Sequence, residues 1–289
     1  MERQLRERLG DLTTRFTERA GHAMDLSREL LQQGFDRIIA AGGDGTINEV
    51  ANGFLQNDAA IRPEAALAIL PLGTGGDYRR TLGIPADLDK AIEILDIGKA
   101  RSVDIGKAMF RGHDGVRRER YFTNVVSFGM GGEVAARSRN FLSPLGGQAA
   151  FLYATVSVFF SYHPKHVRLK LDGAAETPPF RIMNIAVGNG CFHGGGMKIC
   201  PTAALDDGIF EVTVIEHIGA LELIRDVKVL YSDDIYSHPK VKHLRARRIA
   251  AESQERTSIE VDGEPLGTLP LEISVLPAAI QVIAPQRSR

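Results

Sequence analysis

The sequence is poor in several features that would indicate other classes of protein. It contains no tryptophan and only two cysteines, Cys191 and Cys200. Their spacing is not that of a zinc-binding Cys-x-x-Cys pair, and two thiols do not build a disulfide framework. Reduced thiols in a cytoplasmic protein are therefore expected. The formal net charge of −1 provides no overall field for nucleic acid, so we expect no nucleic-acid partner.

Long hydrophobic runs are also missing. The most apolar stretch, residues 148–162, is shorter than the roughly 20 residues that span a bilayer. It predicts a buried or interfacial helix instead. The N-terminus carries Arg3, Arg6 and Arg8 and lacks the apolar segment of a signal peptide.

The chain nevertheless has enough apolar material for two domains, with 289 residues of which 44% are hydrophobic. In its first third, helical and strand-like patterns alternate. Strands are predicted at 12–17, 37–41 and 66–70, and helices at 3–9, at 22–33 with Gly34 as the stop, from 47 onward, and at 88–97. This order predicts a parallel, doubly wound sheet whose ligand site lies at the carboxyl ends of its strands.

The second part of the chain has mostly strand-like patterns and predicts an antiparallel β-sandwich. We place an α/β domain at residues 1–98 and the sandwich at 99–279, and we expect residues 280–289 to return to the first domain. Helical patterns near 148–162 and 220–231 interrupt the sandwich. Its strands are predicted at 102–110, 119–127, 167–171, 180–187, 209–215, 241–249, 257–261 and 271–276.

A glycine-rich turn follows the predicted strand at 37–41. Gly42, Gly43 and Gly45 would allow positive φ and bring backbone N–H groups close to a phosphate. Thr46 and Glu49 have capping-box spacing, which predicts a helix just after the glycines. Asp44 would repel a phosphate, so a divalent cation is inferred nearby. The alternative is an ordinary strand-to-helix turn without a ligand.

Three further stretches carry candidate chemistry. Residues 71–77 form a second glycine-rich turn at the same sheet edge. Residues 259–264 place Asp262 and Glu264 at a strand end, where one carboxylate can accept a proton, or where both are surface acids of a hairpin. Residues 206–208 read as a plain hairpin turn. His193, in a glycine-rich loop, is interpreted as a polar loop residue.

Taken together and in order, four motifs resemble the catalytic domain of the diacylglycerol kinase family of lipid kinases. They are AAGGDGTINEV, PLGTGGD, NGCFHGGGMKICPTAALDDGIFEV and IEVDGEPL. Soluble bacterial diacylglycerol kinases are the most similar, and sphingosine and ceramide kinases are related. GGDGT alone is shared with NAD kinases. The resemblance implies a Rossmann-like α/β domain of the NAD kinase and phosphofructokinase type, a C-terminal β-sandwich, and ATP in the cleft between them.

The resemblance also implies roles for individual residues. Mg²⁺ would bind the Asp207 side chain and the carbonyls of Ala204 and Ile209, with Asp44 and Asp104 as water-bridged partners. Glu264, or else Asp262, would be the general base. The nucleotide-binding residues would be Thr17, Gly42, Gly43, Asp44, Gly45, Thr46, Ile47, Asn48, Glu49 and Thr74.

Two departures from the family pattern bear on the nucleotide. Family members open with a strand that ends in an Asn-Pro-x-Ser-Gly-type turn, whereas this sequence begins after that point. Weaker ATP binding is therefore expected. Gly76 stands where the family has Asn.

The sequence thus predicts an ATP- and Mg²⁺-dependent lipid kinase that converts diacylglycerol or a similar lipid alcohol into phosphatidic acid or its equivalent. An NAD kinase-like enzyme and a non-catalytic nucleotide-binding regulator are the alternatives. Residues 240–248 alternate basic with apolar side chains, and such a face gains about 1 kcal/mol per cation at anionic headgroups. We therefore expect a cytoplasmic protein with peripheral contact at the inner membrane face. The sequence leaves open whether it forms a homodimer.

Overall fold

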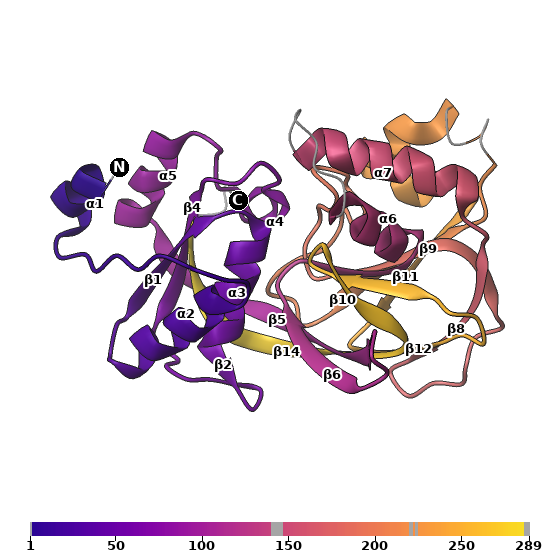
Figure 1. Ribbon diagram of the computed structural model, residues 1–289, viewed down its shortest axis with the longest axis horizontal. Coiled ribbons are helices and arrows are strands. Elements are labelled where there is room, and N and C mark those ends of the chain that lie inside the picture. Colours follow the sequence, from indigo (N-terminus) through magenta and orange to yellow (C-terminus); the bar gives the residue numbers. More distant parts are fainter. Residues whose placement is uncertain (1, 140–146, 220–221, 223–224, 286–289) are drawn as a thin grey trace.

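Two lobes joined by two long strands make up the molecule in a computed structural model (Figure 1). The structure describes residues 2–139, 147–219, 222 and 225–285. Strands β5 (Lys99–Gly112) and β14 (Glu264–Ala284) pair antiparallel and run from one lobe into the other. The lobes therefore share one continuous 12-stranded sheet.

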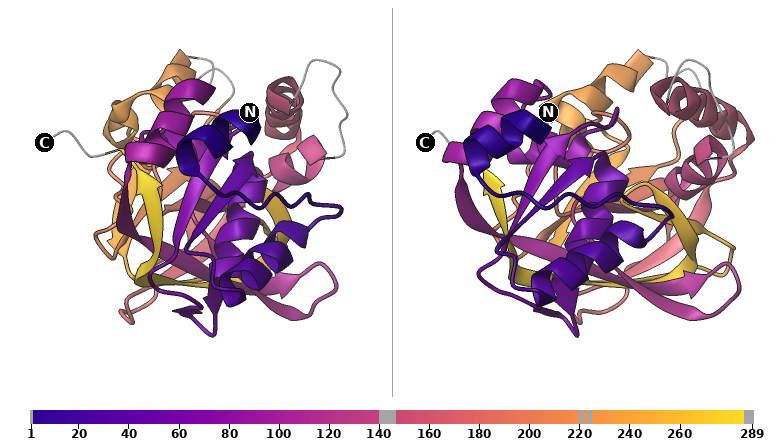
Figure 2. Two further views of the ribbon diagram at one scale, coloured as in Figure 1. Left: turned by 90° about the vertical axis from the view of Figure 1, so that its left-hand side faces the viewer. Right: turned by 60° about the vertical axis from the view of Figure 1, so that its left-hand side comes forward.

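The first lobe is an α/β unit built around three parallel strands. β1 pairs with β4, and β4 pairs with the C-terminal end of β14 through Gln281 and Val282. Helices α2 and α3 pack together, α1 packs on α5, and the two pairs flank the strands (Figure 2). Its elements are α1 (Glu2–Leu9), α2 (His22–Gln32), β1 (Arg37–Gly42), α3 (Asp44–Phe54), β2 (Leu55–Gln56), β3 (Ala59–Ala60), β4 (Ala66–Pro71), α4 (Asp77–Leu82) and α5 (Leu88–Ile97).

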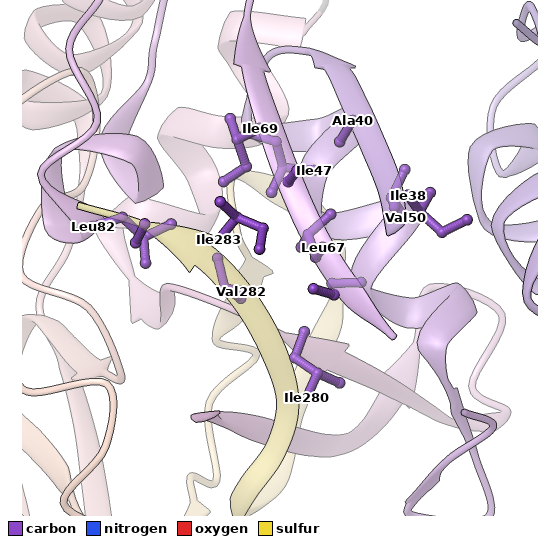
Figure 3. Close-up of a cluster of buried hydrophobic side chains, with 14 of the residues drawn as sticks. Ile38, Ala40, Ile47, Val50, Leu67, Ile69, Leu82, Ile280, Val282 and Ile283 are labelled. Atoms are coloured by element: carbon purple, nitrogen blue, oxygen red, sulfur yellow. The ribbon is translucent and has the colours of Figure 1, made fainter. Parts of the chain in front are cut away.

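The strands of this lobe are short, continuous apolar runs, because they are covered on both faces. Leu67 and Ile69 of β4 are fully buried, and Ile280 and Val282 of β14 join them in the core (Figure 3). Helix ends follow local signals. The Asp87 side chain accepts the N–H of Lys90 at the start of α5, and Gly34 follows α2 in a left-handed conformation.

The strand predicted at residues 12–17 is wrong. These residues lie in an extended segment without regular structure, and almost all of them are exposed. A strand needs a neighbour to complete its backbone hydrogen bonds, and no strand of the described chain pairs with this segment.

The second lobe is the predicted antiparallel β-sandwich. Alternating burial along β8 shows one face in the core and one in solvent. Its helices are α6 (Met130–Arg139), α7 (Gly147–Ser161), and the 3₁₀ helices η1 (Val227–Tyr231) and η2 (Asp233–Ser237). Its further strands are β6 (Arg117–Phe122), β7 (Val125–Gly129), β8 (Lys165–Leu171), β9 (Phe180–Gly188), β10 (Phe210–Glu216), β11 (Val241–Ala246), β12 (Arg248–Glu252) and β13 (Ser258–Val261).

Three expectations for this lobe change in detail. The strand expected at 119–127 is split into β6 and β7, and that expected at 241–249 into β11 and β12. The helix expected at 220–231 lies partly outside the described residues, since 220–221 and 223–224 are not among them, and its end forms η1.

An acidic side chain fixes the junction between the lobes. The β5–β14 register shifts between Leu276 and Ile280, where Ala278 has a φ of 48°. Asp104 of β5 accepts the N–H of Ala278 at 2.8 Å and the N–H of Gly208 at 2.7 Å. Leu205 from the same sandwich loop is buried in the core of the first lobe. Asp104 therefore holds both the bend in β14 and the 204–209 loop.

No helix among the described residues combines the length and the apolarity needed to cross a membrane.

Ile280→Ala tests whether β14 holds the first lobe together. Ile280 is 2% exposed, so its truncation should lower the free energy of unfolding by about 2–5 kcal/mol. Urea unfolding measures this. The control is Ile97→Ala, at a site that is 68% exposed. Equal losses in the two variants would contradict the role assigned to β14.

Candidate active site

The two glycine-rich turns pack directly on each other. A Cβ on Gly73 would lie 2.3 Å from Cα of Gly43, and one on Gly42 would lie 2.5 Å from Oγ1 of Thr46. Gly43 has a φ of −97°, and neither Gly42 nor Gly45 has a positive φ. The expectation of positive φ is therefore wrong. Glycine is required at positions 42 and 73 because backbone meets neighbouring atoms there without space for a side chain.

Helix α3 presents its N-terminus at these turns. The Ile47 N–H donates to the Gly43 carbonyl at 3.0 Å, which leaves the preceding N–H groups at the helix end, as helix geometry requires. A Cβ on Gly45 would meet nothing within 4 Å. Thr74 is exposed on the neighbouring turn, and the Ile47 side chain is buried in the core. The open side of Gly45 is thus where an anion can approach.

Glu49 does not close a capping box on α3. Helix α3 begins at Asp44 and has no side-chain cap. The Glu49 carboxylate instead accepts the N–H groups of Gly21 at 2.8 Å and Ala23 at 3.1 Å, at the start of α2. Thr17 is exposed four residues before Gly21. Glu49 therefore ties the segment that contains Thr17 to α3.

Asp44 has a structural role that the sequence did not reveal. Its carboxylate accepts three N–H groups at the start of α4, from Gly76 at 2.7 Å and from Asp77 and Tyr78 at 3.1 Å. Asp44 therefore joins the two glycine-rich turns, and its presence beside an anion site needs no cation. Gly76 has a φ of 72°, a conformation that Asn also tolerates.

Asp262 joins the lobes at the entrance of β14. It occupies the two-residue turn between β13 and β14 together with Gly263. Its carboxylate accepts five hydrogen bonds of 2.8–3.0 Å, from the Asn48 side chain, the Thr123 hydroxyl, and the backbone N–H groups of Thr123, Asn124 and Val125. Burial raises the pKa of Asp262, while these bonds act to lower it. Because five donors share its two oxygens, this carboxylate has no lone pair left for the proton of a substrate.

Asn48 supplies the first-lobe side of this contact. Its amide nitrogen donates to Asp262 at 2.8 Å and to the Tyr121 carbonyl at 3.0 Å, and its oxygen accepts from Arg120 at 2.8 Å. The Asn48 side chain is buried. Asn48 therefore connects the helix of the glycine-rich turn to the sandwich.

Glu264, in contrast, is accessible. Its side chain is 43% exposed and accepts one hydrogen bond from Arg139 of α6 at 2.9 Å. Exposed ion pairs of this kind contribute about 0–1 kcal/mol, so a substrate group can displace one. Of the two predicted acids, Glu264 is the one placed to receive a proton.

The predicted metal ligands are only partly brought together. Asp207 lies in the 204–209 loop that Asp104 holds, and its carboxylate pairs with Arg245 at 2.8 Å. Burial, together with the charges of Asp207 and Asp206, raises the pKa of Asp104. Asp44, which is bound to α4, does not join them. Within the described part of the chain, the three ligating side chains that lie within 4.8 Å of one another are Glu222, Asp226 and His238.

The surroundings of Asp104 and Asp207 still suit a divalent cation. Carboxylates repel one another here, and each oxygen of Asp104 retains a second lone pair beside its backbone donor. The Tyr78 hydroxyl is buried and has no hydrogen-bond partner in the described residues. Burial and the negative charges of Asp262 and Asp104 raise the pKa of Tyr78. Asp104 and Asp207, with the carbonyls of Ala204 and Ile209, can therefore hold a hard cation.

Several residues of the site were missed by sequence reasoning. Arg139, Asp77 and Glu260 gain their roles only through the fold, as does the contact of Asn48 with Asp262, which lies 214 positions away. Asp77 and Glu260 lie within the motifs PLGTGGD and IEVDGEPL, but no local pattern identifies their partners Gly195 and His193, which lie on a distant segment.

Comparisons with known proteins identify the family of this chain. The family profile described as the diacylglycerol kinase catalytic domain matches residues 1–108, and the YegS C-terminal NAD kinase beta sandwich-like domain matches residues 124–284. A "Probable lipid kinase YegS-like" protein of Chromohalobacter salexigens is 32% identical over 99% of this chain and 88% of its own length. A diacylglycerol kinase of Staphylococcus carnosus is 30% identical over 93% of this chain and 83% of its own.

A solved structure shares the fold. It is a candidate diacylglycerol kinase from Bacillus anthracis str. Sterne, with a TM-score of 0.72 and 26% identity, and it covers 95% of this chain and 86% of the other. From the motifs, the two-lobed fold and these relatives we conclude that the chain belongs to the diacylglycerol kinase catalytic-domain family and is a lipid kinase.

Proposed function

We propose that this lipid kinase transfers the γ-phosphoryl group of ATP to the hydroxyl of diacylglycerol or a similar lipid alcohol, with Mg²⁺. One observation carries the proposal. The accessible carboxylate of Glu264 lies two residues from Asp262, which is hydrogen-bonded to Asn48 on the helix that begins at the glycine-rich turn. A proton acceptor and an anion site thus belong to one connected structure.

The chemistry follows from these positions. The N–H groups at the start of α3 bind phosphate oxygens, and the open side of Gly45 admits them. Glu264 accepts the proton of the lipid hydroxyl while the oxygen of that hydroxyl forms a bond to the γ-phosphorus. The bond between the γ-phosphorus and the β,γ-bridging oxygen breaks, and ADP leaves.

Asp104, Asp207 and the carbonyls of Ala204 and Ile209 would hold Mg²⁺. An ion bound there would supply positive charge at the lobe junction. Asp104 already binds the 204–209 loop and the bend at Ala278. The protein thus orients this part of the cleft with its own hydrogen bonds.

An apolar cavity in the sandwich lobe supports a lipid substrate. Its volume is about 80 Å³, which is less than that of most small-molecule pockets, so only a slender group such as part of an acyl chain fits it. Helix α6 connects it to the site, because Met130 at one end lines the cavity and Arg139 at the other contacts Glu264. Ten helical residues span about 15 Å, a distance that an acyl chain can cover. Other lining residues are Phe159, Met183, Ile215, Val229, Leu230 and Ile235.

Helix α7 is the surface that we propose for membrane contact. Tyr153, Val156 and Phe160 are each about half or more exposed and lie on one face of the helix. Phe159 of the same helix lines the cavity. The basic run at 240–248 is less suitable, because Lys242 pairs with Glu216 and Arg245 pairs with Asp207.

The direct test is an assay of the purified chain with Mg²⁺-ATP and mixed micelles that contain diacylglycerol, a sphingoid base or ceramide. We expect a phosphorylated lipid whose identity names the substrate. A parallel reaction with NAD in place of lipid tests the NAD kinase alternative. Phosphorylation of NAD alone, or of nothing, would overturn the proposal.

Gly45→Val tests the anion site. The valine side chain would fill the space beside the helix end, so ATP binding should be lost while stability changes by less than about 0.5 kcal/mol. Calorimetric titration with ATP and thermal unfolding measure the two effects. Gly219→Val, which also has open space but lies in the loop after β10, is the control. ATP affinity equal to that of wild type in the folded Gly45→Val protein would refute the site.

Glu264→Gln separates the two acids. Glutamine keeps the shape of the side chain but cannot accept the proton, so kcat should fall by about 10² to 10⁴ without loss of stability. Asp262→Asn should instead lower the free energy of unfolding by about 2 kcal/mol, because an amide cannot accept all five hydrogen bonds. Steady-state kinetics and urea unfolding measure the two effects. Wild-type turnover in Glu264→Gln would remove this residue from catalysis.

Asp207→Ala tests the cation site. Mg²⁺ that binds the folded state should raise the Tm of the wild-type protein, and this response should disappear in the variant. Asp233→Ala, which removes an exposed acid paired with Lys198, is the control. The same rise in Tm for wild type and Asp207→Ala would place the ion elsewhere.

A further inference from the structure

A buried ion pair lies behind the turn that carries the proposed base. Nε2 of His193 is 3.2 Å from Oε1 of Glu260, and their side chains are only 14% and 1% exposed. Glu260 belongs to β13, and His193 belongs to the glycine-rich loop of residues 188–197. Burial raises the pKa of Glu260, and the charge on His193 opposes this rise. A charge this deeply buried is costly unless it has a partner, and the imidazole of His193 is the polar group beside it.

Glu260 also binds the catalytic turn directly. Its Oε2 accepts the N–H of Gly263 at 2.6 Å, and Gly263 is the residue between Asp262 and Glu264. The direction of the Glu264 side chain depends on the backbone of this turn. The position of the Glu260 carboxylate therefore influences where the proposed base lies.

The loop that carries His193 is attached to the first lobe. The Gly195 N–H donates to Asp77 of α4 at 2.8 Å, and the Cys191 N–H donates to the Thr81 hydroxyl at 3.2 Å. Two hydrogen bonds between His193 and Met197 close the loop on itself. The loop is thus held at one side by α4 and at the other by Glu260.

Helix α4 is in turn held by Asp44 of the first glycine-rich turn. A series of contacts therefore connects the two ends of the site. Hydrogen bonds join Asp44 to Asp77 and Asp77 to the Gly195 N–H, and the backbone leads from Gly195 to His193. His193 contacts Glu260, which accepts the Gly263 N–H.

We propose that His193 is a positioning residue that, through Glu260, couples α4 of the first lobe to the turn bearing Glu264. The proposal rests on the lipid kinase function and on Glu264 as the base. It assigns a role to a histidine that touches neither the phosphates nor the lipid hydroxyl in the mechanism above. Its loss should displace the base without removing any group that binds ATP.

The first test compares His193→Ala with His193→Gln. Displacement of the base by about 1 Å can lower turnover by about 10²-fold, so we expect His193→Ala to lower kcat by about 10- to 10²-fold with an unchanged Kd for ATP. Glutamine places a polar N–H group near Glu260 and should restore kcat to within about threefold of wild type. The control is His166→Ala, which removes an exposed histidine near Glu255. Wild-type kcat in His193→Ala, or equal losses in the alanine and glutamine variants, would overturn the proposal.

The second test measures coupling in the protein itself and needs no lipid turnover. Amide hydrogen exchange of the 261–264 turn should accelerate in Asp77→Ala and in His193→Ala, because Gly263 loses a firmly held acceptor. The double variant should exchange no faster than the faster single variant, since both changes break one series of contacts. If the increases in exchange rate add in the double variant, or if the exchange rate of the 261–264 turn does not change, the coupling is refuted. Absence of lipid phosphorylation in wild type would instead refute the proposed function and leave this measurement valid.

Discussion

The carboxylate of Asp262 is the contact on which the geometry of the site depends. It accepts hydrogen bonds from Asn48 in one lobe and from residues 123–125 in the other. A buried carboxylate is costly when its donors are missing, and removal of one donor leaves part of that cost uncompensated. Both lobes are therefore held at one point, and the strand that leaves this point carries Glu264. The acid with a single exposed partner is thus placed by the acid whose oxygens are fully hydrogen-bonded.

Other acids in this protein act in the same way on the backbone. Asp44 binds the start of α4, Glu49 binds the start of α2, and Asp104 binds the bend in β14. Each satisfies N–H groups that helix ends and irregular strands leave without partners. These carboxylates fix the loops at the lobe junction, while the helix end at Gly45 and the side chain of Glu264 remain exposed.

Local signals in the sequence predicted much of the fold. Helix α5 was predicted at its observed bounds, and the structure shows that the Asp87 side chain caps its first turn. The continuous apolar run of β4 predicted a strand buried on both faces. The segment 12–17 has a strand-like pattern but no neighbour, and pairing with a distant segment is not encoded locally. The glycines at 42 and 43 were recognised as important, although their reason is close packing against Gly73 and Thr46 rather than positive φ.

By itself, the sequence determined the α/β and β-sandwich lobes, the glycine-rich turn that we propose as an anion site, and the pair of acids at residues 262 and 264, because short-range spacing and turn chemistry specify them. Only the tertiary structure decided which acid is accessible, and it assigned Asp44 and Glu49 to helix ends. It also brought His193 to Glu260, a pairing across 67 positions of sequence. The physical reason is that hydrogen-bond partners and burial are set by segments that meet only in the folded chain, and these two properties decide what a carboxylate can do.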